Sequence, residues 1–261
     1  GFVRNSPEGV IIEIEGPLEK TEAFIKELPV SLPPLAKLSS YSHAEIAPQG
    51  SISFEIIDSE EGKRSKALSS PDSSICPDCA GEMNSQGNRR MNYPFTNCTN
   101  CGPRYTIISS FPYDRERTSM ACFPMCPACL KEYRDPADRR YHAEATCCPK
   151  CGPKLFLLGR DGTRIGENWK AVEKTKELLA EGKIVAVKGL GGFQLAARAD
   201  IKDTVVELRR RKNRESKPFA VMVKDLSTAK KWATLSEADN RALLSPIGPI
   251  VLVPKKKRDI I

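Results

Sequence analysis

The segment "CPACLKEYRDPADRRYHAEATCCPKC", from Cys126 to Cys151, decides how this chain is organised. It begins and ends with a Cys-x-x-Cys pair, and 18 residues separate the two pairs. A related segment, "CPDCAGEMNSQGNRRMNYPFTNCTNC", runs from Cys76 to Cys101, with each paired cysteine 50 positions earlier. A two-residue gap lets one tight turn present two sulfurs from the same side, and a second pair about 15–20 residues on completes a tetrahedral shell. The spacing therefore predicts two four-cysteine zinc sites in a duplicated unit.

The zinc ligands can be divided between the two sites in two ways. Local pairing gives one ion to Cys76, Cys79, Cys98 and Cys101, and the other to Cys126, Cys129, Cys148 and Cys151. The alternative exchanges knuckles between the halves, and loop entropy hardly separates the two arrangements. Because the spacing can close a site by itself, it favours local pairing. Four sulfurs leave no open coordination position, so we expect both ions to be structural.

The main alternative for these cysteines is a set of disulfides or redox dithiols. The knuckles contain Pro77, Pro127 and Pro149, and Gly-Pro follows Cys101 and Cys151, which suits a turn that directs backbone N–H groups at sulfur. This pattern favours zinc. We expect Cys122 and Cys147 to be core or spare thiols, and His142 to be a surface or packing residue.

Composition permits more than one packed domain, since the chain has 261 residues, 40% of them hydrophobic and 28% charged. No apolar run approaches the roughly 18 residues of a membrane span. The formal charge of +8 would fall to about +4 with two zinc-thiolate sites, so it is weak evidence for a nucleic-acid partner. The chain begins with Gly1 and ends in a basic tail, and we expect an internal part of a longer protein.

Upstream of the repeats, the pattern predicts half of a small α/β sandwich. A strand opens the chain in "GFVRN", a turn follows at residues 7–9, and an alternating strand occupies residues 10–15. Apolar residues at helical spacing predict a helix over residues 17–29, with Leu18, Phe24, Ile25 and Leu28 on one face. A further strand is expected in "SISFEII", residues 51–57.

Downstream, helices alternate with strands, which indicates a twisted α/β sheet. Helices are expected at 167–183, 203–213 and 236–245, the last with a capping box of Ser236 and Asp239. Strands are expected at 184–189, from the following glycine-rich turn to residue 199, and at 219–223 and 248–253; those at 184–189 and 219–223 are expected to be buried.

A run of cations ends the helix at 203–213: Arg209, Arg211, Lys212, Arg214 and Lys217. Such a run is usually a solvated helix face. Here it stops just before an expected buried strand, which would place the cations at a sheet edge where anionic ligands commonly bind. The turn with Gly189, Gly191 and Gly192 is a weaker phosphate-binding signal.

Together the motifs "GFVRNSPEGV", both Cys-Pro-x-Cys…Cys-Gly-Pro repeats, "VKGLGGFQLA" and "RRRKNRESKPFAVM" resemble one family over nearly the whole chain. This is the family of carbamoyltransferases that mature [NiFe]-hydrogenase. The resemblance implies a multidomain α+β and α/β protein. Its parts would be the C-terminal part of an acylphosphatase-like, ferredoxin-type sandwich at 1–58, a linker at 59–74, a twin zinc-finger region at 75–155, and the N-terminal part of a YrdC-like twisted α/β sheet at 165–261.

The resemblance also implies an activity. Such an enzyme hydrolyses carbamoyl phosphate, joins the carbamate to ATP as carbamoyl-adenylate, and passes the carbamoyl group to the C-terminal cysteine of a partner maturation protein. Asn5 would orient the attacking water. Lys212 and Arg214 fall on the YrdC-like K-x-R motif, and Lys188 and Lys217 are further nucleotide-binding candidates. Gln194 departs from the family pattern. The resemblance implies a cytoplasmic protein without a membrane partner.

Two other functions fit part of this sequence. A threonylcarbamoyl-adenylate synthase of tRNA modification shares the YrdC-like domain, but the zinc pair and the "GFVRN" segment argue against it. A non-enzymatic zinc ribbon that binds RNA, double-stranded RNA included, is suggested by the basic helix. RNA bases need aromatic platforms, and the aromatic residues do not cluster with the arginine run.

Overall fold

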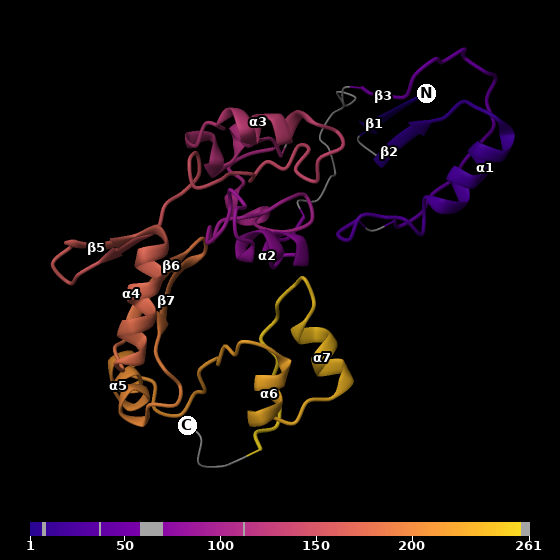
Figure 1. Cartoon of the computed structure of the whole chain (residues 1–261). Coiled ribbons are helices and arrows are strands. Elements are labelled where there is room, and N and C mark those ends of the chain that lie inside the picture. Colours follow the sequence, from indigo (N-terminus) through magenta and orange to yellow (C-terminus); the bar gives the residue numbers. More distant parts are fainter. Residues whose placement is uncertain (7–8, 37, 58–69, 112, 257–261) are drawn as a thin grey trace. The chain divides into compact units, whose positions relative to one another are not determined.

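The computed structural model describes residues 1–6, 9–36, 38–57, 70–111 and 113–256 (Figure 1). It separates into two compact units, Gly1–Ser70 and Pro71–Ile261. Most of the expected linker at 59–74, and the centre of the expected turn at residues 7–9, lie outside the described residues. Within the described residues, no helix is long and apolar enough to cross a membrane.

The first unit is a three-stranded sheet with one helix. Strand β1 (Phe2–Ser6) pairs antiparallel with β2 (Gly9–Glu13) and parallel with β3 (Glu55–Ile56), and α1 (Leu18–Glu27) follows β2. The predicted order of strands and helix is confirmed, although β3 is shorter than expected. The carboxylate of Glu15 accepts hydrogen bonds from the backbone N–H groups of residues 49–51, which fixes the segment leading into β3.

The second unit begins with the two repeats. Each opens with a short helix whose first residue is proline, α2 (Pro77–Asn84) and α3 (Pro127–Arg134). Short 3-10 helices lie between the two repeats, at Tyr105–Ile107, Arg115–Arg117 and Ser119–Cys122. The buried apolar cluster of this region is small: Tyr93, Ile107, Met120, Ala145 and Cys147. So small a core leaves much of the stability of the repeats to metal ligation and polar contacts.

A hairpin and a long helix lead out of the repeats. Strand β4 (Phe156–Leu158) pairs with β5 (Arg164–Glu167), and α4 (Asn168–Ala180) continues from β5. The sequence pattern did not predict this hairpin. Its signal was the Asp161-Gly162 turn, in which Gly162 has a φ of 84°. Helix α4 confirms the predicted helix and ends where Gly182 adopts a φ of 76°.

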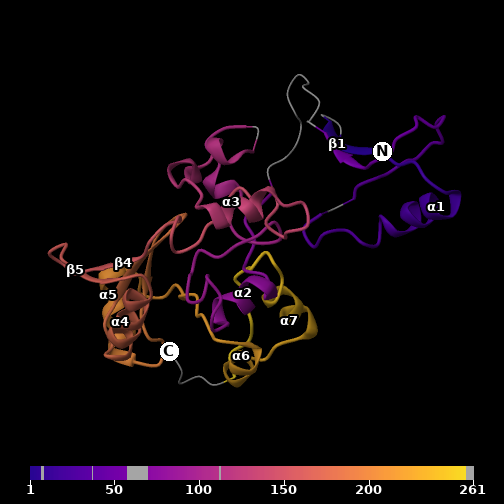
Figure 2. The same cartoon turned by 45° about the horizontal axis from the view of Figure 1, so that its top comes forward.

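The remaining elements are a second hairpin and three helices. Strand β6 (Val185–Gly189) pairs antiparallel with β7 (Gly192–Ala196), and α4 lies against β6 (Figures 1 and 2). Helices α5 (Lys202–Lys212), α6 (Leu226–Trp232) and α7 (Glu237–Leu243) follow. The predicted capping box of α7 is confirmed, with reciprocal bonds between Ser236 and Asp239.

Two predicted strands are wrong. Residues 219–223 and 248–253 form no strand, and Met222 and Leu252 are 96% and 89% exposed. A strand needs a hydrogen-bonded neighbour, and among the described residues neither segment is paired in a sheet. Strand β6 was expected to be buried and is mostly exposed, because among the described residues its sheet has only two strands.

Among the glycines of the repeats, Gly152 leaves the least space for a Cβ atom. A Cβ atom there would lie 2.6 Å from the Cβ of Cys147 and even closer to the hydroxyl of Tyr93. We predict that Gly152→Ala lowers the free energy of unfolding by about 1–3 kcal/mol, through overpacking. Gly81, inside α2, has open space around it, so Gly81→Ala should instead stabilise by about 0.5–1 kcal/mol. Denaturant unfolding of the zinc-loaded variants measures both, and equal effects of the two substitutions would contradict this assignment.

Candidate metal centres and nucleotide-binding segment

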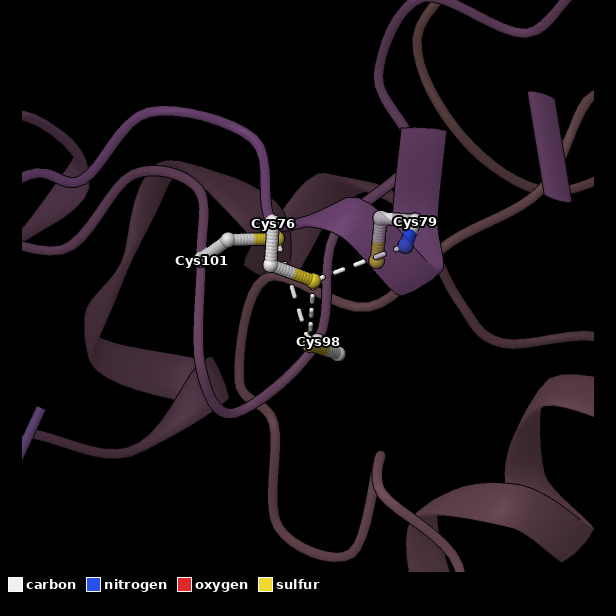
Figure 3. Close-up of side chains that lie close together, drawn as sticks. All are labelled: Cys76, Cys79, Cys98 and Cys101. Atoms are coloured by element: carbon white, nitrogen blue, oxygen red, sulfur yellow. Dashed lines mark hydrogen bonds between the residues drawn. The ribbon is translucent and has the colours of Figure 1, made fainter. Parts of the chain in front are cut away.

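The structure brings the eight predicted metal ligands into two clusters. Cys76, Cys79, Cys98 and Cys101 form one, and Cys126, Cys129, Cys148 and Cys151 form the other; within each, the sulfurs lie within 4.8 Å of one another. Figure 3 shows the first cluster, where two side chains from the start of α2 face two from the loop at 98–101. The clusters therefore follow local pairing, and knuckles are not exchanged between the repeats.

The sulfur positions fit tetrahedral zinc. Four sulfurs at 2.3 Å from one ion would lie about 3.8 Å apart. The observed Sγ–Sγ distances are 3.7 Å for Cys76–Cys98 and 3.9 Å for Cys98–Cys101. In the second cluster, the Sγ–Sγ distance is 3.7 Å for both Cys126–Cys148 and Cys148–Cys151, and 3.6 Å for Cys151–Cys129. Two structural zinc ions fit the two clusters.

Backbone N–H groups also point at the sulfurs, as expected for zinc knuckles. The N–H of Cys79 donates to Cys76 Sγ at 3.5 Å, and that of Asn100 donates to Cys98 Sγ at 3.3 Å. Such bonds stabilise thiolates rather than neutral thiols.

The second repeat reaches into the first metal cluster through two arginines. Arg139 Nη1 donates to Cys79 Sγ at 3.0 Å, and Arg140 Nη2 lies 3.9 Å from the same sulfur. Both guanidinium groups also form ion pairs with Glu82, one helical turn beyond Cys79 on α2. Arg140 is 2% exposed, and its Nε donates to the carbonyl oxygen of Asn97 at 3.1 Å.

The first repeat reaches into the second cluster in the same way. Arg89 Nη1 donates to Cys129 Sγ at 3.3 Å, and Arg90 Nη2 lies 3.7 Å from that sulfur. Both arginines pair with Glu132 on α3, at 2.5 Å and 2.6 Å. Burial raises the pKa of the Glu132 carboxyl, but the bonds from Arg90 and Arg89 outweigh it and lower the pKa to about 2. Glu132 is therefore ionised at neutral pH, and the crossed contacts are charge-assisted.

The six residues of these crossed contacts were missed from the sequence: Arg89, Arg90, Arg139, Arg140, Glu82 and Glu132. A signal was present, since an Arg-Arg pair and a glutamate three residues after a cysteine both recur 50 positions apart. Helical spacing alone could not have shown that each arginine pair serves the opposite repeat.

The leftover cysteines lie outside both metal clusters. Cys147 is 2% exposed, and Tyr93 Oη lies 3.6 Å from its sulfur. Cys147 is at the position in the second repeat that Asn97 occupies in the first. Burial raises the pKa of the Cys147 thiol to about 11. Cys122 is exposed. The His142 ring lies 4.5 Å from the ring of Tyr141 and 4.9 Å from that of Tyr133.

Two arginines of the basic run, Arg209 and Arg214, donate hydrogen bonds to their own loop. Arg214 donates to the carbonyl oxygens of Lys217 at 3.2 Å and Pro218 at 2.6 Å. Arg209 donates to the carbonyl oxygens of residues 214, 215 and 217, and both guanidinium groups lie near the Phe219 ring. These contacts fold the segment 213–219 into a compact turn after α5.

The other nucleotide-binding candidates are lysines. Lys212 ends α5 and Lys217 lies in the turn, and both side chains are exposed. Lys188 lies on β6, with its amine 5.7 Å from the centre of the Phe193 ring. Gln194 lies on β7 opposite Val187. Asn5 lies on β1, opposite Val10 of β2.

Three family models match the chain in succession. The acylphosphatase model matches residues 1–56, the HypF finger model matches 75–108 and 125–158, and the model described as telomere recombination (Sua5, YciO and YrdC) matches 177–261. These matches, with the mixed helices and strands and the paired cysteine clusters, confirm the predicted fold class.

Curated relatives cover the whole chain. Carbamoyltransferase HypF2 of Cupriavidus necator is 46% identical over 98% of this chain and 32% of its own length. Carbamoyltransferase HypF of Rhizobium leguminosarum bv. viciae is 45% identical over 100% of this chain and 32% of its own length. The chain thus spans about a third of the length of these relatives.

Solved structures agree. A crystal structure of full-length HypF in the phosphate- and nucleotide-bound form superposes with a TM-score of 0.87 at 42% identity, over 100% of this chain and 34% of that one. HypF of T. kodakarensis gives a TM-score of 0.82 at 43% identity, over 100% of this chain and 33% of that one. By the two HypF fingers, the flanking family models and identity along its whole length, this chain belongs to the HypF family of carbamoyltransferases.

Proposed function

We propose that this chain is part of a hydrogenase-maturation carbamoyltransferase that uses carbamoyl phosphate and ATP. The observation that carries the proposal is the match to carbamoyltransferases along the whole chain, through three family models in their order. Its domain limits would be 1–58 for the acylphosphatase-like part, 59–74 for the linker, 75–155 for the zinc fingers and 165–261 for the YrdC-like part.

The first step would take place in the acylphosphatase-like part. Water attacks carbamoyl phosphate, the bond to phosphate breaks, and carbamate and inorganic phosphate are released. Asn5, on β1, would orient that water through its side-chain amide.

The second step would take place in the YrdC-like part. A carbamate oxygen attacks the α-phosphate of ATP, giving carbamoyl-adenylate and pyrophosphate. Lys188, Lys212, Arg214 and Lys217 would balance the charge of the departing pyrophosphate. A relative solved with phosphate and nucleotide bound supports ligands of this class. Since Arg214 already donates to two carbonyl oxygens, its main part would be to shape the turn that presents Lys212 and Lys217.

The final step would pass the carbamoyl group to a partner. The C-terminal cysteine thiol of a maturation protein would displace AMP, forming a thiocarbamate on the way to the cyanide ligands of [NiFe]-hydrogenase. We further propose a cytoplasmic location for this activity, as the family resemblance implies.

The zinc ions would be structural in this scheme. We assign one to Cys76, Cys79, Cys98 and Cys101 and one to Cys126, Cys129, Cys148 and Cys151, as the sulfur geometry supports. Each shell is closed by four sulfurs, so the ions would hold the bridge between the flanking domains rather than bind substrate.

RNA binding by the basic helix has less support. Arg210 and Arg211 pair with Glu207, while Arg209 and Arg214 donate to backbone carbonyls. The arginines of the run therefore mainly contact groups within this chain rather than facing a nucleic acid.

The nucleotide assignment is tested by carbamate-dependent exchange of pyrophosphate into ATP, in a protein of full family length that contains this chain. Lys212→Ala removes a charge-assisted contact to phosphate, and such contacts contribute about 1.5–3 kcal/mol, so exchange should fall about tenfold or more. Arg210→Ala is the matched control, since that side chain pairs with Glu207 on the helix surface. Equal exchange by both variants would refute the assignment.

The zinc assignment is tested by metal analysis and thiol labelling of the intact chain. We expect two zinc ions per chain. Before chelation, a maleimide should label Cys122 rapidly, while the eight ligands and the buried Cys147, with its pKa raised to about 11, should be protected. Cys122→Ser should abolish the rapid phase. Well under two zinc ions, or labelling of Cys147 as fast as Cys122, would contradict the assignment.

A further inference from the structure

The arginines of each zinc finger meet a sulfur of the other finger's cluster. We infer that the two zinc sites are thermodynamically coupled, because Arg89 and Arg90 balance the charge of one thiolate shell and Arg139 and Arg140 that of the other. The inference rests on the zinc assignment above and is independent of the carbamoyl chemistry.

The contacts occur twice, which argues against chance. Arg139 to Cys79 at 3.0 Å and Arg89 to Cys129 at 3.3 Å are the same contact displaced by 50 positions. Each arginine pair is also anchored by a glutamate on the helix that carries the sulfur. Each outer guanidinium group thus contacts both a sulfur and a carboxylate of the same helix.

The charge of each shell explains what the arginines do. Four thiolates and one Zn²⁺ carry a net charge of about −2. Cys79 and Cys129, which receive the arginines, are both 0% exposed, so water cannot screen this charge there. An unbalanced buried charge is costly, and a paired guanidinium offsets it.

The position of the arginines explains the coupling. Each pair lies in the loop between the two knuckles of its own finger, at 80–97 or 130–147. Binding of metal in one finger joins the ends of that loop and so places its arginines at the other finger's sulfur. Each site then favours occupation of the other by the same factor, as linkage requires.

The test is pulsed alkylation with mass spectrometry, which follows each cysteine after a chelator is added to the zinc-loaded chain. Arg139→Gln should speed labelling of the opposite set, Cys76, Cys79, Cys98 and Cys101, about tenfold or more, since loss of an outer partner commonly costs 10–100-fold in metal affinity. The set that belongs to its own finger should be labelled later, after the opposite site has lost its metal. Arg89→Gln should give the mirror result. Arg139 and Arg89 suit this test because their side chains are 26% and 32% exposed.

Two variants separate this role from general destabilisation. Arg139→Lys keeps a cation and should restore part of the protection. Arg134→Gln changes an exposed arginine of the same finger and should leave both sets at the wild-type rate. Faster labelling of the variant's own set alone, of its own set before the opposite set, or of neither would overturn the inference. If purified Arg139→Gln holds one zinc, the vacant site must be the opposite one; a vacant site in its own finger would also overturn it.

Reciprocity is tested by removing a ligand. Cys98→Ala empties the first site, and the chelator-dependent labelling of Cys126, Cys129, Cys148 and Cys151 should become about tenfold faster. Unchanged labelling of that set would show that the two sites are independent. A wild-type chain with no bound zinc would instead refute the zinc assignment itself.

Discussion

Two pairs of arginines, each reaching into the neighbouring repeat, hold the middle of this chain together. Arg90 and Arg140 are both 2% exposed, and each is satisfied by a carboxylate and a carbonyl oxygen of the other half. A buried guanidinium is tolerated only with such partners. The five-residue apolar cluster beside them is small, so the fingers depend on metal ligation and on these ion pairs to stay folded.

The arginine contacts between the two repeats also give a physical reason for the duplication. A four-cysteine unit of this length could close around its metal alone, yet each unit here leaves a thiolate to be balanced from outside. With two copies, each unit supplies the arginines that balance the thiolate charge of the other. The two fingers therefore pack together as one body. Such a body suits the proposed place of the fingers between two catalytic domains. The compact turn at 213–219, built by Arg209 and Arg214 on Phe219, is a second case where arginine fixes the backbone.

The sequence predicted what depends on local spacing. The Cys-x-x-Cys pairs predicted both clusters, and Ser236 with Asp239 predicted the start of α7, because these features need only neighbouring residues. Features that depend on contacts between distant segments were missed. The crossed arginines are of this kind, because the polar sequence around them is typical of a solvated loop. Residues 219–223 read as a strand by composition, but β propensity becomes a strand only beside a pairing neighbour. The resemblance to a family supplied the candidate roles of Asn5 and the lysines, which no spacing rule could have given.

The most direct test of this account is X-ray absorption at the zinc edge, on the intact chain with its bound metal. Closed, structural thiolate shells predict two zinc ions per chain, each with four sulfur neighbours at about 2.3 Å and no lighter ligand. Nitrogen or oxygen in the shell, or an average of three sulfurs per zinc, would show that the clusters are open sites and would contradict the account.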